Sequence, residues 1–316
     1  MKRLFLDTIH NITVSATEEC AVTVGVFDGM HQGHLRVLHL LQKVADRLDL
    51  GRTMVTFADH PDAILGKHSP EMILSLEHRL RLMERNGVDL AVIIPFNDEI
   101  RNTSARDFVL DFLMQVLKSR AIILGHDSKF GKGCEGNLAF LNQHKQEWNI
   151  EVHATPEVSV GGKAISSTRI REAIRSGDLR LAEEMLGREV SILGKVVHGD
   201  GRGRQLGFPT ANVDSQSEII PPPAVYEVTV LLKGIRKRAV LSIGTRPTFH
   251  GNRERRPTIE VHIPGFSGNI YGEYMEIFIV RKIRDQKQFD SVEALLGNIR
   301  KDIASLGLPA QRNNSN

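Results

Sequence analysis

Residues 25–34, GVFDGMHQGH, place three glycines and two histidines at a point where the pattern of apolar residues changes. The preceding residues 20–27, CAVTVGVF, are apolar and β-branched, which is typical of a buried strand. After this stretch apolar side chains recur at helical spacing, at Leu35, Leu38, Leu41, Ala45 and Leu48. The stretch is therefore a strand, a glycine-rich turn and the start of a helix, where free backbone N–H groups and the helix dipole favour a bound phosphate.

Strands and helices alternate through the first half of the chain. The pattern of apolar residues and of helix ends predicts strands at residues 52–57, 88–96, 119–125 and 151–158, and helices at 75–87 and 104–117. Two short helices, broken at Gly177, are expected within residues 166–187. This alternation predicts an α/β domain with a parallel sheet and crossover helices over residues 1–187.

The pattern changes from about residue 190 onward. Short β-rich runs punctuated by glycine and proline predict an antiparallel β-barrel domain over residues 188–316, with strands within residues 189–199, 224–234, 236–244, 257–265 and 274–283. A helix closes this domain, and the tail from about residue 309, which is polar, is expected to be disordered.

The bulk composition excludes several classes of protein. A length of 316 residues favours two domains, and a net charge of +3 fits an enzyme for anionic substrates as well as a nucleic-acid binder. Cys20 and Cys134 are the only cysteines, which excludes a disulfide framework and a cysteine-based zinc cluster. The first residues turn polar too soon for a signal peptide and no apolar run is long enough to span a membrane, so we expect a cytoplasmic protein.

A second cluster of phosphate-binding character, ISSTRIR, occupies residues 165–171 at the start of an expected helix. Hydroxyl groups and an arginine at a helix N-terminus suit an anion. Ser167 or Thr168 could equally cap the helix, and both interpretations can hold, because a capping hydroxyl and an anion seek the same N–H groups.

These two motifs, together with several others, resemble the bacterial bifunctional riboflavin kinase/FMN adenylyltransferase (FAD synthetase) family. The resemblance covers nearly the whole chain and includes TFADHP (56–61), LGHDSKFG (124–131), HGDGRGRQLGFPTAN (198–212), IGTRPTF (243–249) and IEVHIPGF (259–266). It implies a Rossmann-like nucleotidyltransferase domain followed by a riboflavin kinase barrel. It also implies that riboflavin is phosphorylated to FMN and that FMN is adenylylated to FAD with release of pyrophosphate, with ATP as co-substrate and Mg²⁺ as cofactor. Partners would be these small molecules, without nucleic acid or membrane.

The resemblance assigns roles to residues of the first domain. His31 and His34 are expected to donate hydrogen bonds to the α- and β-phosphates of ATP, as phosphate ligands rather than a metal pair. Arg169 is expected to stabilise the leaving pyrophosphate. These roles suit the reaction because it needs positioning and electrostatic stabilisation. The remaining ATP-binding residues would be Gly25, Phe27, Asp28, Gly29, Gly33, Ser166, Ser167 and Thr168. The flavin-binding residues would be His60, Pro61, Asp127 and Phe130, although Asp127 could simply form a turn and Phe130 could belong to the core.

In the second domain the resemblance implies a kinase site. Thr210 and Asn212 would hold Mg²⁺ and ATP phosphates, since hydroxyl and amide oxygens are suitable hard ligands. Glu260 would act as general base on the ribityl 5′-hydroxyl. Alternatively, Glu260 is only a solvent-facing residue on a strand whose other face is apolar. The further ATP-binding residues would be Gly201, Gly203 and Arg204.

The chain departs from the family pattern at five positions. Ala58 and Asp59 replace the usual Asp-Pro, Ser128 replaces an aromatic residue, Ala224 replaces a glycine and Ser242 replaces an asparagine. The first three bear on FMN binding and the last two on kinase activity.

Two other functions compete with the two-step enzyme. One is an FMN adenylyltransferase with a weakened kinase module. The other is an RNA-binding or regulatory protein that uses the basic residues between 233 and 256, which have only Phe249 as an interleaved aromatic. These basic residues are Lys233, Arg236, Lys237, Arg238, Arg253, Arg255 and Arg256, and a solvated face explains them better.

Overall fold

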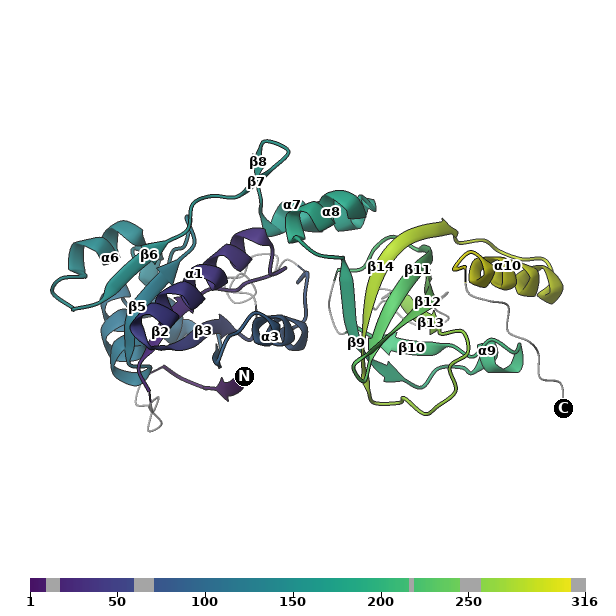
Figure 1. The fold of residues 1–316 in the computed structure, drawn as a ribbon, viewed down its shortest axis with the longest axis horizontal. Coiled ribbons are helices and arrows are strands. Elements are labelled where there is room, and N and C mark those ends of the chain that lie inside the picture. The colour runs from purple at the N-terminus through teal and green to yellow at the C-terminus, as the bar shows by residue number, and fades with distance from the viewer. Residues whose placement is uncertain (10–17, 60–70, 216–218, 245–256, 308–316) are drawn as a thin grey trace. The chain divides into compact units, whose positions relative to one another are not determined.

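The computed structural model describes residues 1–9, 18–59, 71–215, 219–244 and 257–307 (Figure 1). They form two compact units, one of Met1–Ile170 with Met185–Gly187 and the other of Arg171–Glu184 with Arg188–Asn316. The division between Ile170 and Arg171 falls inside the helix Ser167–Ser176. The sequence predicts a domain boundary after residue 187, and that boundary stays a prediction. The tail expected to be disordered from about residue 309 lies outside the described residues.

The first unit is built on a six-stranded sheet in the order β1-β4-β3-β2-β5-β6. All its strand pairs are parallel, which confirms the predicted parallel sheet. The edge strand β1 was not expected, because its charged residues interrupt the apolar pattern. The strands are β1 (Lys2–Phe5), β2 (Cys20–Val24), β3 (Gly51–Phe57), β4 (Leu90–Ile94), β5 (Ser119–Leu124) and β6 (Glu151–Ala154).

Helices cover this sheet through apolar side chains. Helix α1 (Gln32–Leu48) contacts β2, β3 and β5 and buries Val37, Leu38, Leu41, Val44 and Ala45. The helix predicted at residues 104–117 begins as α5 (Ala105–Asp107) and continues as the π-helix η1 (Phe108–Val116). The η1 residues Phe108 and Phe112 join the core cluster formed with the sheet.

The other elements of the first half connect these layers. Helix α3 (Leu76–Arg85) is capped by the Ser75 hydroxyl, which accepts from the His78 amide, and the chain leaves the helix through Asn86 and Gly87, close to the predicted end. Gly177 separates α7 from α8, as predicted. The elements are α4 (Asp98–Asn102), η2 (Lys132–Cys134), α6 (Leu138–His144), β7 (Ser159–Val160), β8 (Lys163–Ala164), α7 (Ser167–Ser176) and α8 (Leu179–Leu186).

A closed antiparallel barrel forms the body of the second unit and confirms the predicted fold. Its strand order is β10-β13-β12-β11-β14-β9. Strand β10 was not expected, because its residues follow a Gly-rich loop and a Pro-Thr turn. The strands are β9 (Ser191–Val197), β10 (Ala211–Asp214), β11 (Ala224–Leu232), β12 (Ile235–Gly244), β13 (Thr258–His262) and β14 (Tyr274–Asp285), and the short helix α9 (Arg202–Gln205) lies in the Gly-rich loop.

A shielded ion pair attaches the last helix, α10 (Val292–Ala304), to the barrel. Arg284 at the end of β14 donates from Nε and Nη2 to the Asp302 carboxylate at 2.8–3.2 Å. The two side chains are only 16% and 6% exposed. Because both groups are removed from water, each depends on the other for its charge balance.

We expect Asp302→Asn to destabilise the second unit strongly. The substitution leaves the Arg284 guanidinium poorly compensated, and breaking a buried pair costs about 3–5 kcal/mol. Asp285→Asn is the matched control, because Asp285 is 77% exposed in its pair with Lys282, and exposed pairs contribute about 0–1 kcal/mol. Urea unfolding of both variants measures the difference, and equal losses for the two would contradict this role for Asp302.

Candidate functional sites

The order of the sheet marks a ligand-binding position at the carboxyl end of β2. From β2 the strands β3, β4 and β1 extend to one side, and β5 and β6 extend to the other. The loops that leave β2 and β5 therefore run in opposite directions, and α/β sheets bind ligands in the crevice between such loops. The loop after β2 is the GVFDGMHQGH motif, so the predicted phosphate-binding turn lies at this position.

The two histidines of the motif are held together at the start of α1. His31 is the N-cap, and its Nδ1 accepts from the His34 amide at 3.4 Å. The two rings are stacked with their centroids 3.7 Å apart, and the Phe27 ring meets the His34 ring edge-on at 5.1 Å. Because Nδ1 of His31 accepts a hydrogen bond, the neutral ring carries its proton on Nε2 and is a donor there. This arrangement suits the donation to phosphate that the sequence predicts.

Gly33 gives the His31 ring the space it needs. A Cβ at position 33 would lie 3.0 Å from Cε1 and 3.1 Å from Nδ1 of that ring, a closer approach than a side chain tolerates easily. Gly25 and Gly29 lie in the same turn, and Gly29 has a φ of +82°, which favours glycine.

Asp28 and Ser167 tie the turn to distant parts of the chain. The Asp28 side chain is buried, and its Oδ1 accepts from the amides of Ile73 and Leu74 at 2.9 and 3.3 Å. Its backbone carbonyl accepts from the Ser167 hydroxyl at 3.0 Å. The structure therefore brings the two predicted phosphate-binding motifs together, although they are 139 residues apart in sequence.

The start of α7 is capped by a different serine from those the sequence suggested. The Ser166 hydroxyl accepts from the Arg169 amide at 3.3 Å, so Ser166 rather than Ser167 or Thr168 fills the capping role. Thr168 is exposed. Ser167 uses its hydroxyl on Asp28 instead, and it therefore serves the contact between the motifs.

Arg169 is engaged with the short hairpin that precedes α7. Its Nη1 donates to the carbonyls of Lys163 and Ala164, at 2.8 Å for Lys163, and its Nη2 donates to the carbonyl of Val160 at 3.3 Å. These bonds hold β7 and β8 against the first turn of α7. Its contact with pyrophosphate stays a prediction.

The structure describes two of the four residues predicted to bind the flavin, Asp127 and Phe130. His60 and Pro61 lie outside the described residues. Phe130 packs against Phe108 and Phe140 with ring centroids 5.9 and 6.4 Å away, which supports its interpretation as a core residue. Asp127 is exposed on the turn that follows β5.

Ser128, where the family pattern has an aromatic residue, closes that turn. Its hydroxyl accepts from the Gly125 amide at 2.9 Å, and its own amide donates to the Gly125 carbonyl at 3.2 Å. The substitution therefore has a local structural role after β5.

In the barrel, Asn212, Glu260 and Ser242 form one row across three strands. Asn212 on β10 lies opposite Glu260 on β13, and Glu260 lies opposite Ser242 on β12. Directly opposed residues of antiparallel strands present their side chains on the same face. Thr210 donates from its hydroxyl to Glu260 Oε2 at 3.3 Å, so the predicted metal ligands and the predicted base are brought together.

This row lies on the outer face of the barrel wall. The residues flanking Glu260 along β13, Ile259 and Val261, are buried, whereas Glu260 is half-buried. The sequence alternative of an outward-facing residue is thus correct for its orientation. Its neighbours Thr210 and Asn212 distinguish it from an ordinary solvated glutamate.

A pocket of about 490 Å³ adjoins Thr210 and includes side chains of the inner face. It is lined by residues that include Val196, Arg204, Thr210, Val261, Phe266 and Tyr271. The loop with Gly201 and Gly203 approaches it closely, since a Cβ on Gly203 would lie 2.5 Å from the Phe208 carbonyl oxygen and 3.2 Å from the Thr210 hydroxyl. Thr210 therefore lines this pocket and also donates a hydrogen bond to Glu260 of the row.

The two departures expected to affect the kinase are accommodated without strain. Ala224 is buried at the start of β11 and is absent from the residues with positive φ, so no glycine is needed there. Ser242 accepts from Nε2 of Gln286 at 3.0 Å, and the same amide donates to the Ile243 carbonyl at 2.9 Å.

The basic residues considered for RNA binding are largely ion-paired where they are described. Lys233, Arg236 and Arg238 pair with Glu273, Glu189 and Glu227 respectively. Arg253, Arg255, Arg256 and Phe249 lie outside the described residues. The interpretation of the basic run as a solvated face stays a prediction.

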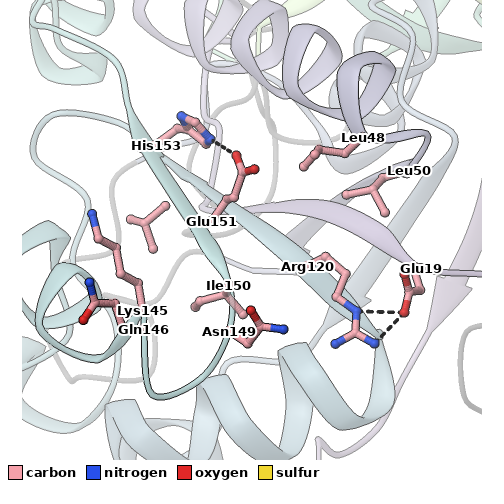
Figure 2. Close-up of a pocket in the computed structure, with 11 residues that line it drawn as sticks. Glu19, Leu48, Leu50, Arg120, Lys145, Gln146, Asn149, Ile150, Glu151 and His153 are labelled. Carbon is pink, nitrogen blue, oxygen red and sulfur yellow. Dashed lines mark hydrogen bonds and ion pairs between the residues drawn. The ribbon is translucent and has the colours of Figure 1, made fainter.

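A larger pocket, of about 690 Å³, lies at the amino edge of the parallel sheet, and Figure 2 shows side chains that line it. The lining includes Glu19, Arg120 and Glu151 and no residue of the histidine turn. Four of its ionisable side chains are paired: Arg120 Nε donates to Glu19 Oε1 at 2.7 Å, and His153 Nε2 lies 2.8 Å from Glu151 Oε2. Lys145 donates instead to the side-chain oxygen of Asn142 at 3.1 Å. Hydrogen bonds from Arg47 and His153 lower the pKa of the Glu151 carboxyl. The carboxyl edge, where the Ser167 hydroxyl joins the two predicted phosphate-binding motifs, therefore stays the candidate site of this unit.

Two further observations concern the described residues. No group of three or more His, Cys, Asp and Glu side chains there could hold a metal ion. Within the same residues, no helix is both long and apolar enough to cross a membrane.

Comparisons with known proteins agree with both halves of the structure. Residues 13–169 match the FAD synthetase family and residues 186–307 match the riboflavin kinase family. The bifunctional riboflavin kinase/FMN adenylyltransferase of Escherichia coli K12 is 34% identical over 93% of this chain and 94% of its own, and that of Bacillus subtilis 168 is 31% identical over 96% of each.

A solved structure shares the whole architecture. The crystal structure of a protein from Streptococcus pneumoniae, described as a macrolide-efflux protein, has 29% identity and a TM-score of 0.82 over 98% of this chain and all of its own. Together with the two family matches and the two bacterial relatives, these findings show that the chain belongs to the bifunctional riboflavin kinase/FMN adenylyltransferase family.

Proposed function

We propose that the first unit adenylylates FMN at the histidine turn and that the barrel phosphorylates riboflavin beside Glu260, so that the chain converts riboflavin to FAD in two ATP-dependent steps. The observation that carries the first assignment is the hydrogen bond from Ser167 to the Asp28 carbonyl, which joins two phosphate-binding motifs at the switch point of the sheet. The row of Asn212, Glu260 and Ser242 beside Thr210 supports the second.

Adenylyl transfer requires no protein nucleophile. An oxygen of the FMN phosphate attacks the α-phosphorus of ATP, the bond to the β-phosphate oxygen breaks, and pyrophosphate leaves. His31 and His34 donate to the phosphates as charge develops, and the N-terminus of α1 adds its dipole. Arg169 exchanges carbonyl contacts of the hairpin for the leaving pyrophosphate.

Riboflavin phosphorylation starts from a neutral hydroxyl and therefore needs a base. Glu260 takes the proton of the ribityl 5′-hydroxyl while that oxygen attacks the γ-phosphorus and ADP leaves. The oxygen donors Thr210 and Asn212 fit Mg²⁺, which prefers hard oxygen ligands together with phosphate. When bound, the ion neutralises phosphate charge, and Arg204 with the loop of Gly201 and Gly203 holds the nucleotide.

The proposal also covers the domain bounds, the partners and the location of the enzyme. The adenylyltransferase domain spans residues 1–187 and the kinase domain residues 188–316. Its partners are riboflavin, FMN and ATP, without nucleic acid or membrane, and it acts in the cytoplasm.

We expect His31→Ala or His34→Ala to abolish FAD formation while FMN still accumulates from riboflavin, because both side chains belong to the first site only. Chromatography of the flavins formed from riboflavin and ATP measures both steps together. His39→Ala is the matched control, since His39 is exposed on the same helix. Normal FAD synthesis by either site variant would remove the histidines from the reaction.

We expect Glu260→Gln to slow riboflavin phosphorylation by about 10²- to 10⁴-fold, the usual contribution of a general base. Added FMN should still become FAD at the wild-type rate. Glu293→Gln, at an exposed position of α10, controls for loss of a carboxylate. FMN formation at an unchanged rate would show that Glu260 is an ordinary strand residue, and no FMN formation by the wild type would favour the weakened-kinase alternative.

A further inference from the structure

Arg79, on α3, is a charged side chain inside the first unit. It is 1% exposed, and its guanidinium binds the ends of two neighbouring strands. Nη1 donates to the Val26 carbonyl at 2.7 Å and to the Thr56 hydroxyl at 3.0 Å. Nη2 donates to the carbonyls of Phe57 and Ala58 at 3.1 and 3.3 Å.

Burying the Arg79 cation at this position costs desolvation free energy. No carboxylate among the described residues forms an ion pair with Arg79, and its Nε has no hydrogen-bond partner there. Burial lowers the pKa of Arg79 to about 10, while the charges of Asp28 and Asp59 oppose that shift, so the group stays protonated at neutral pH. An apolar residue of similar size would avoid the desolvation cost. The guanidinium therefore has to supply something that apolar packing cannot.

It supplies the orientation of the peptide groups in the turn. In a planar trans peptide the C=O and N–H bonds point in opposite directions. Because Arg79 draws the Val26 carbonyl inward, the Phe27 N–H is directed to the other side, and Phe27 adopts a φ of +54°. This N–H has no hydrogen-bond partner in the described part of the chain. The Ala58 carbonyl places the Asp59 N–H in the same way.

Asp28 completes a closed set of contacts around α3. Its carboxylate binds the amides of Ile73 and Leu74, just before α3, while Arg79 within α3 binds Val26, two residues before Asp28. The turn and the entry to α3 are thus fixed to each other at two points. One contact uses an anion from the turn and the other uses a cation from the helix.

We propose that Arg79 is the positioning residue of the adenylyltransferase site, which sets the turn of residues 25–31 and the segment 56–59 so that their N–H groups face the phosphates of the bound substrates. This rests on the assignment of FMN adenylylation to the histidine turn. Arg79 acts through the backbone and does not touch the reacting atoms. Its loss affects FAD formation and leaves riboflavin phosphorylation, in the other unit, unchanged.

The test compares Arg79→Lys with wild type in the full chain, with FMN and ATP supplied and kcat and KM determined separately. A lysine ammonium keeps the charge but cannot span the carbonyls of Val26 and Ala58 as the guanidinium does. We expect kcat for FAD formation to fall about 10- to 100-fold, as small misplacements of reacting groups produce. The KM for FMN should change less than kcat does, because Arg79→Lys alters none of the side chains predicted to bind the flavin.

Two further variants separate positioning from simple stabilisation. Thr56→Val removes the hydroxyl between Arg79 and the Val26 carbonyl without changing charge, and we expect a loss in kcat of about threefold, the equivalent of one hydrogen bond. Arg81→Met removes a cation from the same helix, where Arg81 forms a partly exposed pair with Glu77, and should leave kcat unchanged. The folded fraction, followed by circular dichroism, and the riboflavin kinase rate are measured on every preparation.

The proposal is overturned if Arg79→Lys keeps the wild-type kcat, if its kcat loss is explained by its folded fraction, or if Arg81→Met loses as much. His31→Ala in the same assay separates a failure of the site assignment from a failure of the role proposed for Arg79. If His31→Ala still makes FAD, the site assignment fails. If His31→Ala is inactive and Arg79→Lys is fully active, only the role of Arg79 fails.

Discussion

The reversal of strand order at β2 is the constraint on which the first unit depends. Strands lie on both sides of β2, so its carboxyl end opens into a crevice between diverging loops. The GVFDGMHQGH turn fills that position, and it contains residues such as Phe27 and Met30 with positive φ, which L-residues adopt at a cost. Such a turn keeps its shape only if the surroundings determine it. Buried and partly buried polar contacts from Asp28, Ser167 and Arg79 meet that requirement.

The two proposed sites use opposite kinds of polar group. The first is built from donors: imidazole N–H groups, the N-terminus of α1 and an arginine. The second is centred on oxygen atoms: the Thr210 hydroxyl, the Asn212 amide and the Glu260 carboxylate, with Arg204 assigned to the nucleotide beside them. This difference follows from the two nucleophiles. The FMN phosphate is already an anion and needs only charge stabilisation, whereas the riboflavin hydroxyl must lose a proton and suits a base with a cation.

Local patterns in the sequence predicted the architecture well because the apolar periodicities are strong. The parallel sheet, the barrel and the turn at the start of α1 all follow from residues adjacent in the chain. Contacts between distant residues could not be predicted in this way. Arg79 lies in EHRLRLMER among other arginines of a helix, and only tertiary packing makes it buried while Arg81 remains at the surface. The bond from Ser167 to Asp28 and the packing of Phe130 likewise depend on the folded chain.

In this assignment one chain performs two group transfers, with different leaving groups, at separate sites. The most direct measurement follows riboflavin, FMN, FAD, ADP and pyrophosphate together over time, with wild-type protein, riboflavin, ATP and Mg²⁺. We expect one ADP for every riboflavin consumed and one pyrophosphate for every FAD formed, with FMN appearing before FAD. FAD formation without an equal amount of pyrophosphate, or riboflavin consumption without ADP, would contradict it.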